Sequence, residues 1–194
     1  MAALEAETNV IRDELVAQLK AYWEKFHPYI QYPPGAPVNQ WKALNYSPDW
    51  SALHLWRDGR KNHENCALFP ATTRILEGVP MADQPGFAPT AMISVLQPRT
   101  GIPPHTGSSN TRLIAHLPLI IPEGCGFRLG NDTRPWTLGE SFVFDDTIEH
   151  EAWNDSDQLR AVLIFDVWNP LLTDTERTLV TELMLALNNY NQGR

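Results

Sequence analysis

Residues 141–168 read SFVFDDTIEHEAWNDSDQLRAVLIFDVW, and this stretch decides the fold class. It contains three short runs with the β-branched and aromatic composition of strands, at residues 141–144, 149–153 and 159–167. The turn signal Asn154-Asp155 separates the last two runs. No crossover helix lies between these runs, so they indicate strands that pair antiparallel.

The same pattern extends back along the chain as far as Met92. Glycine and proline turn signals separate further strand-like runs at residues 92–96, 111–121 and 125–129. Six or more short strands with turns between them favour an antiparallel sandwich or barrel. The predicted fold class is therefore mainly β, with a jelly roll as the favoured form.

Helices are predicted on both sides of this region. At residues 9–26 apolar side chains recur every three or four positions, as one buried helix face requires. Residues 27–39, HPYIQYPPGAPVN, predict an ordered loop, and residues 51–57 predict a strand. Thr173 and Glu176 form a capping box that begins a C-terminal helix. We expect this helix to pack on the barrel through an apolar stripe of Leu179, Val180, Leu183, Met184 and Leu187.

A chain of 194 residues predicts a single domain. Within it we expect a helical and loop extension over residues 1–50, a jelly-roll core over residues 51–172 and a C-terminal helix over residues 173–194. The sequence does not predict an oligomeric state.

The charge balance argues against a nucleic-acid partner. The chain has 15 Lys and Arg against 23 Asp and Glu, a net charge of −8, so it lacks the basic footprint that phosphate binding needs. The acidic N-terminus does not resemble a secretory signal, and the longest apolar run, residues 113–121, is too short to span a membrane. Cys66 and Cys125 are too few for a disulfide framework and suit small buried groups. We therefore expect a soluble, cytoplasmic protein without a membrane span.

Two histidines suit a metal site. His105 lies in the loop sequence PPHTG, and His150 lies at the start of a predicted strand, 45 positions later. Two imidazoles at strand edges in a small barrel can meet at its mouth and hold a transition metal, although a lone histidine is more often structural. Gly107 cannot supply the carboxylate of a two-histidine, one-carboxylate iron site. Water or a remote carboxylate would fill that position, and the candidates are Asp145, Asp146 and Glu149, of which the two aspartates also suit a turn.

Arg160 stands in an otherwise apolar strand, where a buried guanidinium needs an anionic partner. If it faces into the barrel, it would bind a small dicarboxylate, and the Ser94 hydroxyl would add a contact. The alternative is an Arg160 that points outward. Arg112, Ile114 and His116 are spaced evenly on one strand, so they share a face that suits either a ligand-lined wall or an exposed surface.

Other enzyme classes lack their motifs in this sequence. There is no G-x-S-x-G elbow, no phosphate-binding P-loop, no H-E-x-x-H and no G-x-G-x-x-G. Hydrolase, kinase and dinucleotide-dependent functions are therefore less favoured.

Three motifs together resemble the aspartyl/asparaginyl β-hydroxylase family of iron(II)- and 2-oxoglutarate-dependent dioxygenases. They are HTGSSN from His105, FDDTIEHEAWN around His150, and an arginine, Arg160, ten residues beyond His150. The resemblance covers roughly residues 50–172 and implies a double-stranded β-helix, with His105 and His150 as iron ligands and water in place of the missing carboxylate.

The resemblance also implies roles for other residues. Arg160 and Ser94 would bind the distal carboxylate of 2-oxoglutarate, and His116 would hold the end nearer the metal. Arg112 matches an arginine of the motif and would contact substrate, whereas the basic residue often found two positions later is Ile114 here. That departure weighs against an acidic peptide substrate.

The activity implied is hydroxylation of an unactivated C–H bond in an amino-acid-derived, peptide or related substrate. Oxygen and 2-oxoglutarate would be consumed, giving succinate and carbon dioxide. Residues 1–90 would shape substrate access, with Trp41, Trp56 and Arg74 as candidates. Two alternatives stay open: a cupin-like barrel in which two histidines bind a metal for other chemistry, and a binding module without catalysis.

Overall fold

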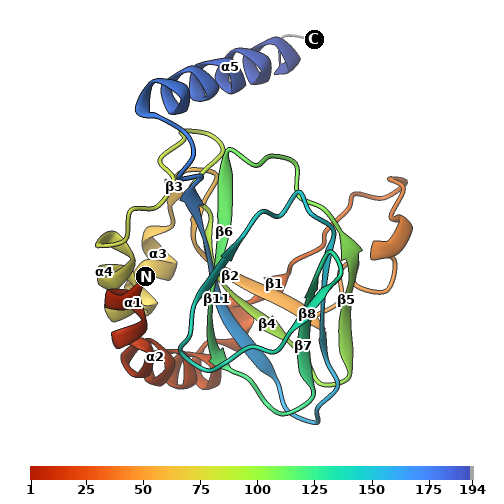
Figure 1. Ribbon diagram of the computed structural model, residues 1–194. Helices are drawn as coiled ribbons and strands as arrows, with labels where there is room; N and C mark the ends of the chain where they lie inside the picture. Colours follow the sequence, from red (N-terminus) through yellow and green to blue (C-terminus); the bar gives the residue numbers. More distant parts are fainter. Residues whose placement is uncertain (193–194) are drawn as a thin grey trace.

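Two antiparallel sheets form the body of the protein in a computed structural model that describes residues 1–192 (Figure 1). The larger sheet has the strand order β1 (His27–Pro28), β2 (Trp50–Arg57), β4 (Ala91–Leu96), β11 (Arg160–Trp168), β6 (Arg112–Ile120) and β9 (Phe142–Phe144), with β3 (Arg60–Lys61) paired to β2. The smaller sheet has the order β5 (Thr100–His105), β10 (His150–Asn154), β7 (Cys125–Leu129) and β8 (Asp132–Arg134).

From β4 onward the chain passes repeatedly between the two sheets. β4, β6, β9 and β11 belong to the larger sheet, and the strands between them in sequence belong to the smaller one. This alternation is the jelly-roll, or double-stranded β-helix, topology. The predicted fold class is confirmed: a mainly β protein with helices at both ends of the chain.

The larger sheet is buried on both faces, as the composition of β11 illustrates. Alternate side chains of a strand point to opposite faces. Leu163 and Phe165 are fully buried in the core on the outer face, and Val162 belongs to the core between the sheets. Burying such a side chain contributes about 2 kcal/mol, so both faces stabilise the sheet.

Helices near the N-terminus cover the outer face of the larger sheet (Figure 1). They are α1 (Ala2–Ala6), α2 (Thr8–Ala21), α3 (His63–Leu68) and α4 (Pro70–Glu77). The predicted helix at residues 9–26 exists as α2 but ends at Ala21, because Tyr22 leaves the helical conformation with φ −139°. A short 3-10 helix, η1 (Trp23–Lys25), follows, and a second, η2 (Asn39–Trp41), lies in the loop before β2.

Sequence reasoning missed α3 and α4, which lie inside the range expected to be jelly-roll core. The start of α4 explains how so short a helix forms. Pro70 occupies its first turn, where the missing N–H has no helical partner in any case. The Glu14 carboxylate of α2 accepts hydrogen bonds from the backbone N–H groups of Ala71 and Thr72, both at 2.8 Å. The cap therefore comes from a distant residue that local sequence does not reveal.

Sequence reasoning also missed strands β5 and β8. β5 contains Pro103 and Pro104, which cannot donate to a β-ladder. They are tolerated because β5 is an edge strand that pairs only with β10. His105 is consequently the last residue of a strand and not a loop residue, which corrects the sequence-based expectation.

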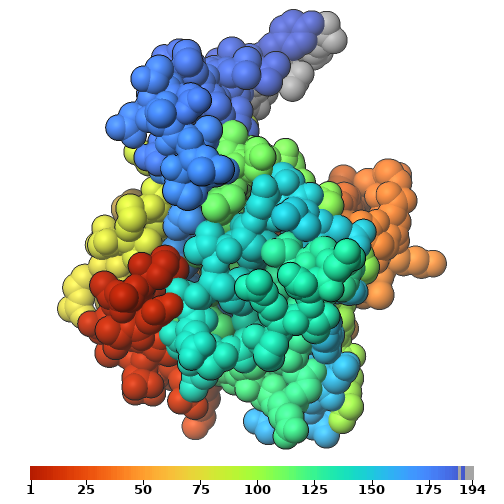
Figure 2. All heavy atoms as spheres, in the orientation of Figure 1, coloured from red at the N-terminus to blue at the C-terminus, as the bar shows by residue number. Residues whose placement is uncertain are grey.

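The C-terminal helix α5 (Asp174–Gln192) forms as predicted, but its expected packing on the barrel is wrong. Its capping box is present, since Glu176 accepts hydrogen bonds from the backbone N–H and hydroxyl of Thr173. The leucine stripe, however, is exposed: Leu179, Leu183 and Leu187 are 58%, 60% and 53% accessible. Figures 1 and 2 show α5 in blue, standing away from the barrel. The last two residues of the predicted helix, 193 and 194, lie outside the described residues.

The same helix touches the body through an adjoining face, which includes Met184, a member of the expected stripe. The Arg177 guanidinium lies 5.6 Å from the centre of the Trp168 ring, and the side-chain amide of Gln84 lies 3.0 Å from the Met184 sulfur. Across residues 1–192, no helix combines the length and the hydrophobicity that crossing a bilayer requires.

Candidate active site

A cavity of about 430 Å³ lies between the two sheets. Both sheets and the loop before β2 contribute to its wall, which therefore combines residues that are far apart in sequence. The residues expected to bind the metal, the cosubstrate and the substrate all line it: Ser94, His105, Arg112, His116, His150 and Arg160. Arg160 therefore faces into the barrel, and the alternative of an outward guanidinium is excluded.

The two expected metal ligands face each other across neighbouring strands. His105 of β5 and His150 of β10 are direct partners in the antiparallel ladder, and their ring centres are 4.1 Å apart. His105 Nδ1 lies 2.8 Å from the Pro103 carbonyl oxygen, and His150 Nδ1 lies 2.9 Å from that of Ile148. Each Nδ1–H donates to a carbonyl, so each Nε2 keeps its lone pair, as a metal ligand requires.

Burial lowers the pKa of both imidazoles, although the hydrogen bond to a backbone carbonyl acts in the opposite direction in each case. Both rings are consequently neutral at pH 7, the protonation state that binds metal. The two rings are neutral, keep their Nε2 lone pairs and lie side by side on paired strands, so they fit a divalent metal between them.

Asp146 occupies the space beside Gly107. The Gly107 N–H donates to the Asp146 carbonyl oxygen at 2.6 Å, and a side chain at position 107 would overlap the Asp146 carboxylate. One carboxylate oxygen, Oδ1, is buried without a hydrogen-bond partner in the described chain, and burial raises the pKa of this group. The absence of a side chain at position 107 thus makes room for a carboxylate from the loop before β10.

The other two candidate carboxylates have structural partners. Asp145 Oδ1 accepts hydrogen bonds from the backbone N–H and the hydroxyl of Thr147, so it caps a turn. Glu149 is 57% exposed and forms an ion pair with Arg128. Within residues 1–192, no three His, Cys, Asp or Glu side chains are grouped closely enough to bind a metal by themselves.

Arg160 is a buried cation without a carboxylate partner in the described chain. It is 1% exposed, and its Nη1 lies 3.4 Å from the Ser94 hydroxyl, which also accepts a hydrogen bond from Trp50 Nε1 at 3.1 Å. The guanidinium stacks 4.2 Å from the centre of the Trp136 ring, and its Nε has no hydrogen-bond partner.

Burial lowers the pKa of Arg160 to about 10, so the guanidinium is still charged at pH 7. An uncompensated charge in such a place is unfavourable unless a ligand brings the opposite charge. Arg160 and Ser94 therefore fit the carboxylate of a small acid.

His116 lies in an aromatic cage. Its ring centre is 5.1 to 5.5 Å from those of Phe144, Phe142 and Phe127, and 6.2 Å from that of Trp136. Burial lowers the pKa of His116 well below its usual value, and the positive charge of Arg160 acts in the same direction. The ring is therefore neutral at pH 7, and its buried Nδ1 is free to meet a ligand since no described residue bonds to it.

Arg112, Ile114 and His116 share the cavity face of β6, as their even spacing predicted. Arg112 Nε lies 3.2 Å from Asp166 Oδ1, and Asp166 Oδ2 accepts a hydrogen bond from the Thr90 N–H at 2.7 Å. Asp166, 2% exposed, was missed from the sequence. Its spacing from Arg160 on the same strand is even, and this was the signal that it faces the same cavity.

The loop before β2 and the first residue of β2 provide an aromatic wall that the sequence reasoning found only in part. Trp41 contacts His105 edge-on at 5.0 Å between ring centres, as expected for a residue that shapes access. Tyr29 stacks on Trp50 at 4.2 Å, and neither of these was singled out. Trp56 and Arg74 do not line the cavity, which corrects the expectation for both. Trp56 is buried in the core under the helices, and Arg74 is exposed on α4.

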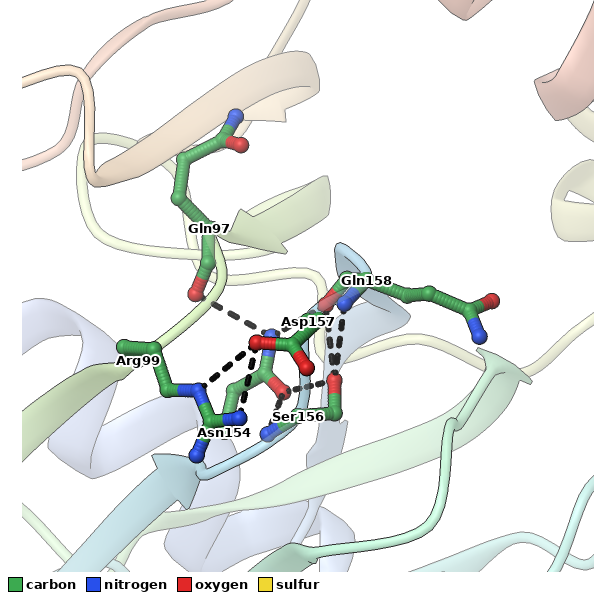
Figure 3. Close-up of polar contacts among 6 residues, drawn as sticks. All are labelled: Gln97, Arg99, Asn154, Ser156, Asp157 and Gln158. Atoms are coloured by element: carbon green, nitrogen blue, oxygen red, sulfur yellow. Dashed lines mark hydrogen bonds and ion pairs between the residues drawn. The ribbon is translucent and has the colours of Figure 1, made fainter.

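The asparagine of the FDDTIEHEAWN motif has a structural role. Asn154 is fully buried, and its Nδ2 donates to the carbonyl oxygens of Leu96, Gln97 and Gln158. Its Oδ1 accepts from the N–H and hydroxyl of Ser156 (Figure 3). These bonds hold the end of β4 against the turn that precedes Arg160, so the network fixes the strands that carry Ser94 and Arg160.

Comparison with known proteins finds one family. A family model described as "Aspartyl/Asparaginyl beta-hydroxylase" matches residues 5–170. The "Aspartyl/asparaginyl beta-hydroxylase" of Mus musculus is 37% identical over 170 residues, which cover 84% of this chain and 23% of the relative. The protein of the same name from Homo sapiens is 37% identical over 177 residues, which cover 90% of this chain and 22% of the relative.

A bacterial relative carries a different name. The "Ornithine lipid ester-linked acyl 2-hydroxylase" of Rhizobium tropici is 35% identical over 133 residues, which cover 67% of this chain and 45% of the relative. This chain therefore matches less than half the length of these three relatives. Among solved structures, a Cupin_2 domain of an XRE family transcriptional regulator from Enterobacter cloacae aligns with 62% of this chain and 98% of that domain, with a TM-score of 0.42 and 9% identity.

Proposed function

Because the chain belongs to the aspartyl/asparaginyl β-hydroxylase family, we propose that it is a hydroxylase that uses iron(II), 2-oxoglutarate and oxygen. The observation that carries the proposal is the pairing of two unlike sites in one cavity. Two neutral histidines with free Nε2 atoms face the cavity, and so does a buried arginine without a carboxylate partner among the described residues.

The histidine pair would hold the metal. His105 and His150 are fixed by hydrogen bonds to backbone carbonyls, so neither ring needs to reorient to present Nε2. Two protein ligands leave several coordination positions for 2-oxoglutarate, oxygen and water. Asp146, beside Gly107, faces this region and would accept a hydrogen bond from such a water.

The arginine would hold the other end of 2-oxoglutarate. Its distal carboxylate would receive donors from Arg160 and Ser94, and this pairing would compensate the buried positive charge. A charge on Arg160 or on His150 acts on His116, which therefore lies near both sites. The neutral His116 ring would contact the end of 2-oxoglutarate nearer the metal. When bound, iron(II) and 2-oxoglutarate supply oxygen activation, with succinate and carbon dioxide as the products of the cosubstrate.

The remaining residues would exclude water and position the substrate. Four aromatic rings surround His116, those of Phe127, Phe142, Phe144 and Trp136. This apolar surrounding would keep water from that part of the cavity. Arg112, held by Asp166, would contact an amino-acid-derived, peptide or related substrate. The proposed compartment is the cytoplasm, where thiols such as those of Cys66 and Cys125 stay reduced.

Oxygen-dependent formation of succinate tests the proposal. Purified protein is mixed with iron(II), 2-oxoglutarate and oxygen, and succinate is measured for the wild type, His105→Ala and the matched control His63→Ala, which removes an exposed histidine outside the cavity. We expect succinate from the wild type and the control and none from His105→Ala. Wild-type protein that binds iron(II) but forms no succinate would refute the proposal.

A further inference from the structure

A groove of about 970 Å³ continues the cavity toward the surface. Tyr29, Ile30, Tyr32, Thr90 and Arg112 line both spaces, so the two are joined at these residues. We name the outer space the entrance groove and define it by Tyr29, Tyr32, Tyr46, His54, Arg57 and Arg112. It is larger than the cavity and is lined by many hydrogen-bonding side chains, which suits the body of a polar substrate that reaches inward.

A β-bulge in β2 turns Arg57 into this groove. Before the bulge the register pairs Leu53 with Ile93 and His54 with Met92, but Ala91 then pairs with Trp56, which leaves one extra residue on β2. An extra residue changes the alternation of side chains, and bulges of this kind often lie beside active sites.

The burial of β2 follows this change. On the groove side lie Ala52 and His54, and on the helix-covered side lie Leu53, Leu55 and Trp56. Because Leu55 and Trp56 are consecutive and face the same side, Arg57 returns to the side of His54. Strict alternation would have placed the Arg57 guanidinium on the apolar side with Leu53 and Leu55.

Arg57 is only weakly paired. Its Nε lies 3.8 Å from Asp58 Oδ2, and the two side chains are 70% and 65% exposed. Exposed pairs of this kind contribute little, so an incoming oxyanion can displace Asp58. Arg112, by contrast, is already held by the buried carboxylate of Asp166.

We infer that Arg57 anchors a carboxylate or phosphate group that the substrate carries outside the cavity. The inference rests on the proposed function, because it names the substrate class of that site: an extended acid whose charged group stays in the entrance groove while an uncharged part reaches the metal. The groove is lined by Arg57, Arg112 and Asp58, and Asp166 beside it pairs with Arg112, so two positive charges meet two negative charges in a chain whose net charge is −8. It is thus a place where an anion meets no excess of negative charge.

Binding of two simple probes tests the inference without turnover. Phenyl phosphate and phenylacetate each join a ring, for contact with Tyr29 and Tyr46, to an oxyanion. Each is titrated into isotope-labelled protein saturated with 2-oxoglutarate, and amide chemical shifts are followed. We expect saturable shifts in β2 and residues 27–32, and the stronger of the two probes identifies the oxyanion.

Two arginines of the β2–β3 hairpin distinguish a specific contact of Arg57 with the probe from a general effect of positive charge. Arg57→Ala should weaken binding about fivefold to tenfold, and Arg57→Lys should restore part of it. The matched control Arg60→Ala removes the same charge from an exposed residue that faces Arg57 across the hairpin and does not line the groove, so it should change binding less than about twofold. Absence of wild-type binding to both probes, or equal weakening in Arg57→Ala and Arg60→Ala, would overturn the inference. If the protein forms no succinate but the probes still bind through Arg57, the proposed function fails while the anion site stands.

Discussion

Replacement of Arg160 by methionine should have opposite effects on ligand binding and on stability. The guanidinium is 1% exposed, and burial lowers its pKa to about 10, between two and three units below that of a free guanidinium, so the folded protein disfavours the charged form. At about 1.4 kcal/mol per pKa unit, the charge costs about 3 kcal/mol at pH 7 in the absence of ligand. A lowered pKa for a base means that this cost is present at every pH below about 10.

Part of this cost is already offset. The stacking on Trp136 contributes about 1 kcal/mol, and the contact with Ser94 contributes about as much. Arg160→Met should therefore leave the free energy of unfolding unchanged or raise it by about 1 kcal/mol. Affinity for 2-oxoglutarate should fall by about 3 to 5 kcal/mol, or at least a hundredfold, because the buried carboxylate loses its partner.

Urea unfolding with and without 2-oxoglutarate measures both effects. Wild-type protein should gain stability as 2-oxoglutarate is added, whereas Arg160→Met should gain almost none. Arg99→Met is the matched control, since Arg99 is 63% exposed and pairs with Asp157 outside the cavity. A variant that loses more than about 2 kcal/mol of stability without ligand would refute the view of Arg160 as an uncompensated cation. So would unchanged affinity for 2-oxoglutarate.

Three further predictions concern the rest of the chain. Asn154→Ala should lower the free energy of unfolding, measured in urea, by about 2 to 4 kcal/mol, because three carbonyl oxygens lose their donor. A loss below about 1 kcal/mol would contradict a structural role for the hydrogen bonds of Asn154. Burial lowers the pKa of His54 to about 4, so the free energy of unfolding should fall as pH drops from about 6.5 toward 4. In unfolding curves measured over this pH range, His54→Gln should reduce the fall, and an unchanged slope would contradict the prediction. Leu183→Asn on α5 should change stability by less than about 0.5 kcal/mol, whereas a loss of about 2 kcal/mol or more in thermal or urea unfolding would mean that the stripe is buried after all.

The β-rich part of the fold could be predicted because its signals are local. Short strand-like runs with turns between them indicated most strands, and even spacing on one strand placed Arg112 and His116 on the same wall. The apolar residues around Arg160 in its strand also predicted that the guanidinium needs an anionic partner, and the guanidinium does face the cavity.

The features that sequence reasoning missed depend on distant partners. Pro103 and Pro104 argue against a strand unless β5 is known to be an edge. The place of Asp146 beside Gly107 depends on how two loops meet, and the groove-facing Arg57 depends on a bulge that alternation alone does not reveal. The leucine stripe of α5 is periodic in sequence, yet periodicity does not say which surface covers a face.

The central claim is that His105, His150 and Arg160 hold one metal and one cosubstrate together. The most direct test is an anaerobic titration of 2-oxoglutarate into iron(II)-loaded protein, followed by the visible metal-to-cosubstrate charge-transfer band. We expect a saturable band in the wild type and in His63→Ala, no band in His150→Ala, and a band in Arg160→Met only at far higher 2-oxoglutarate concentration. A folded wild-type protein that binds iron(II) but develops no band would contradict the central claim.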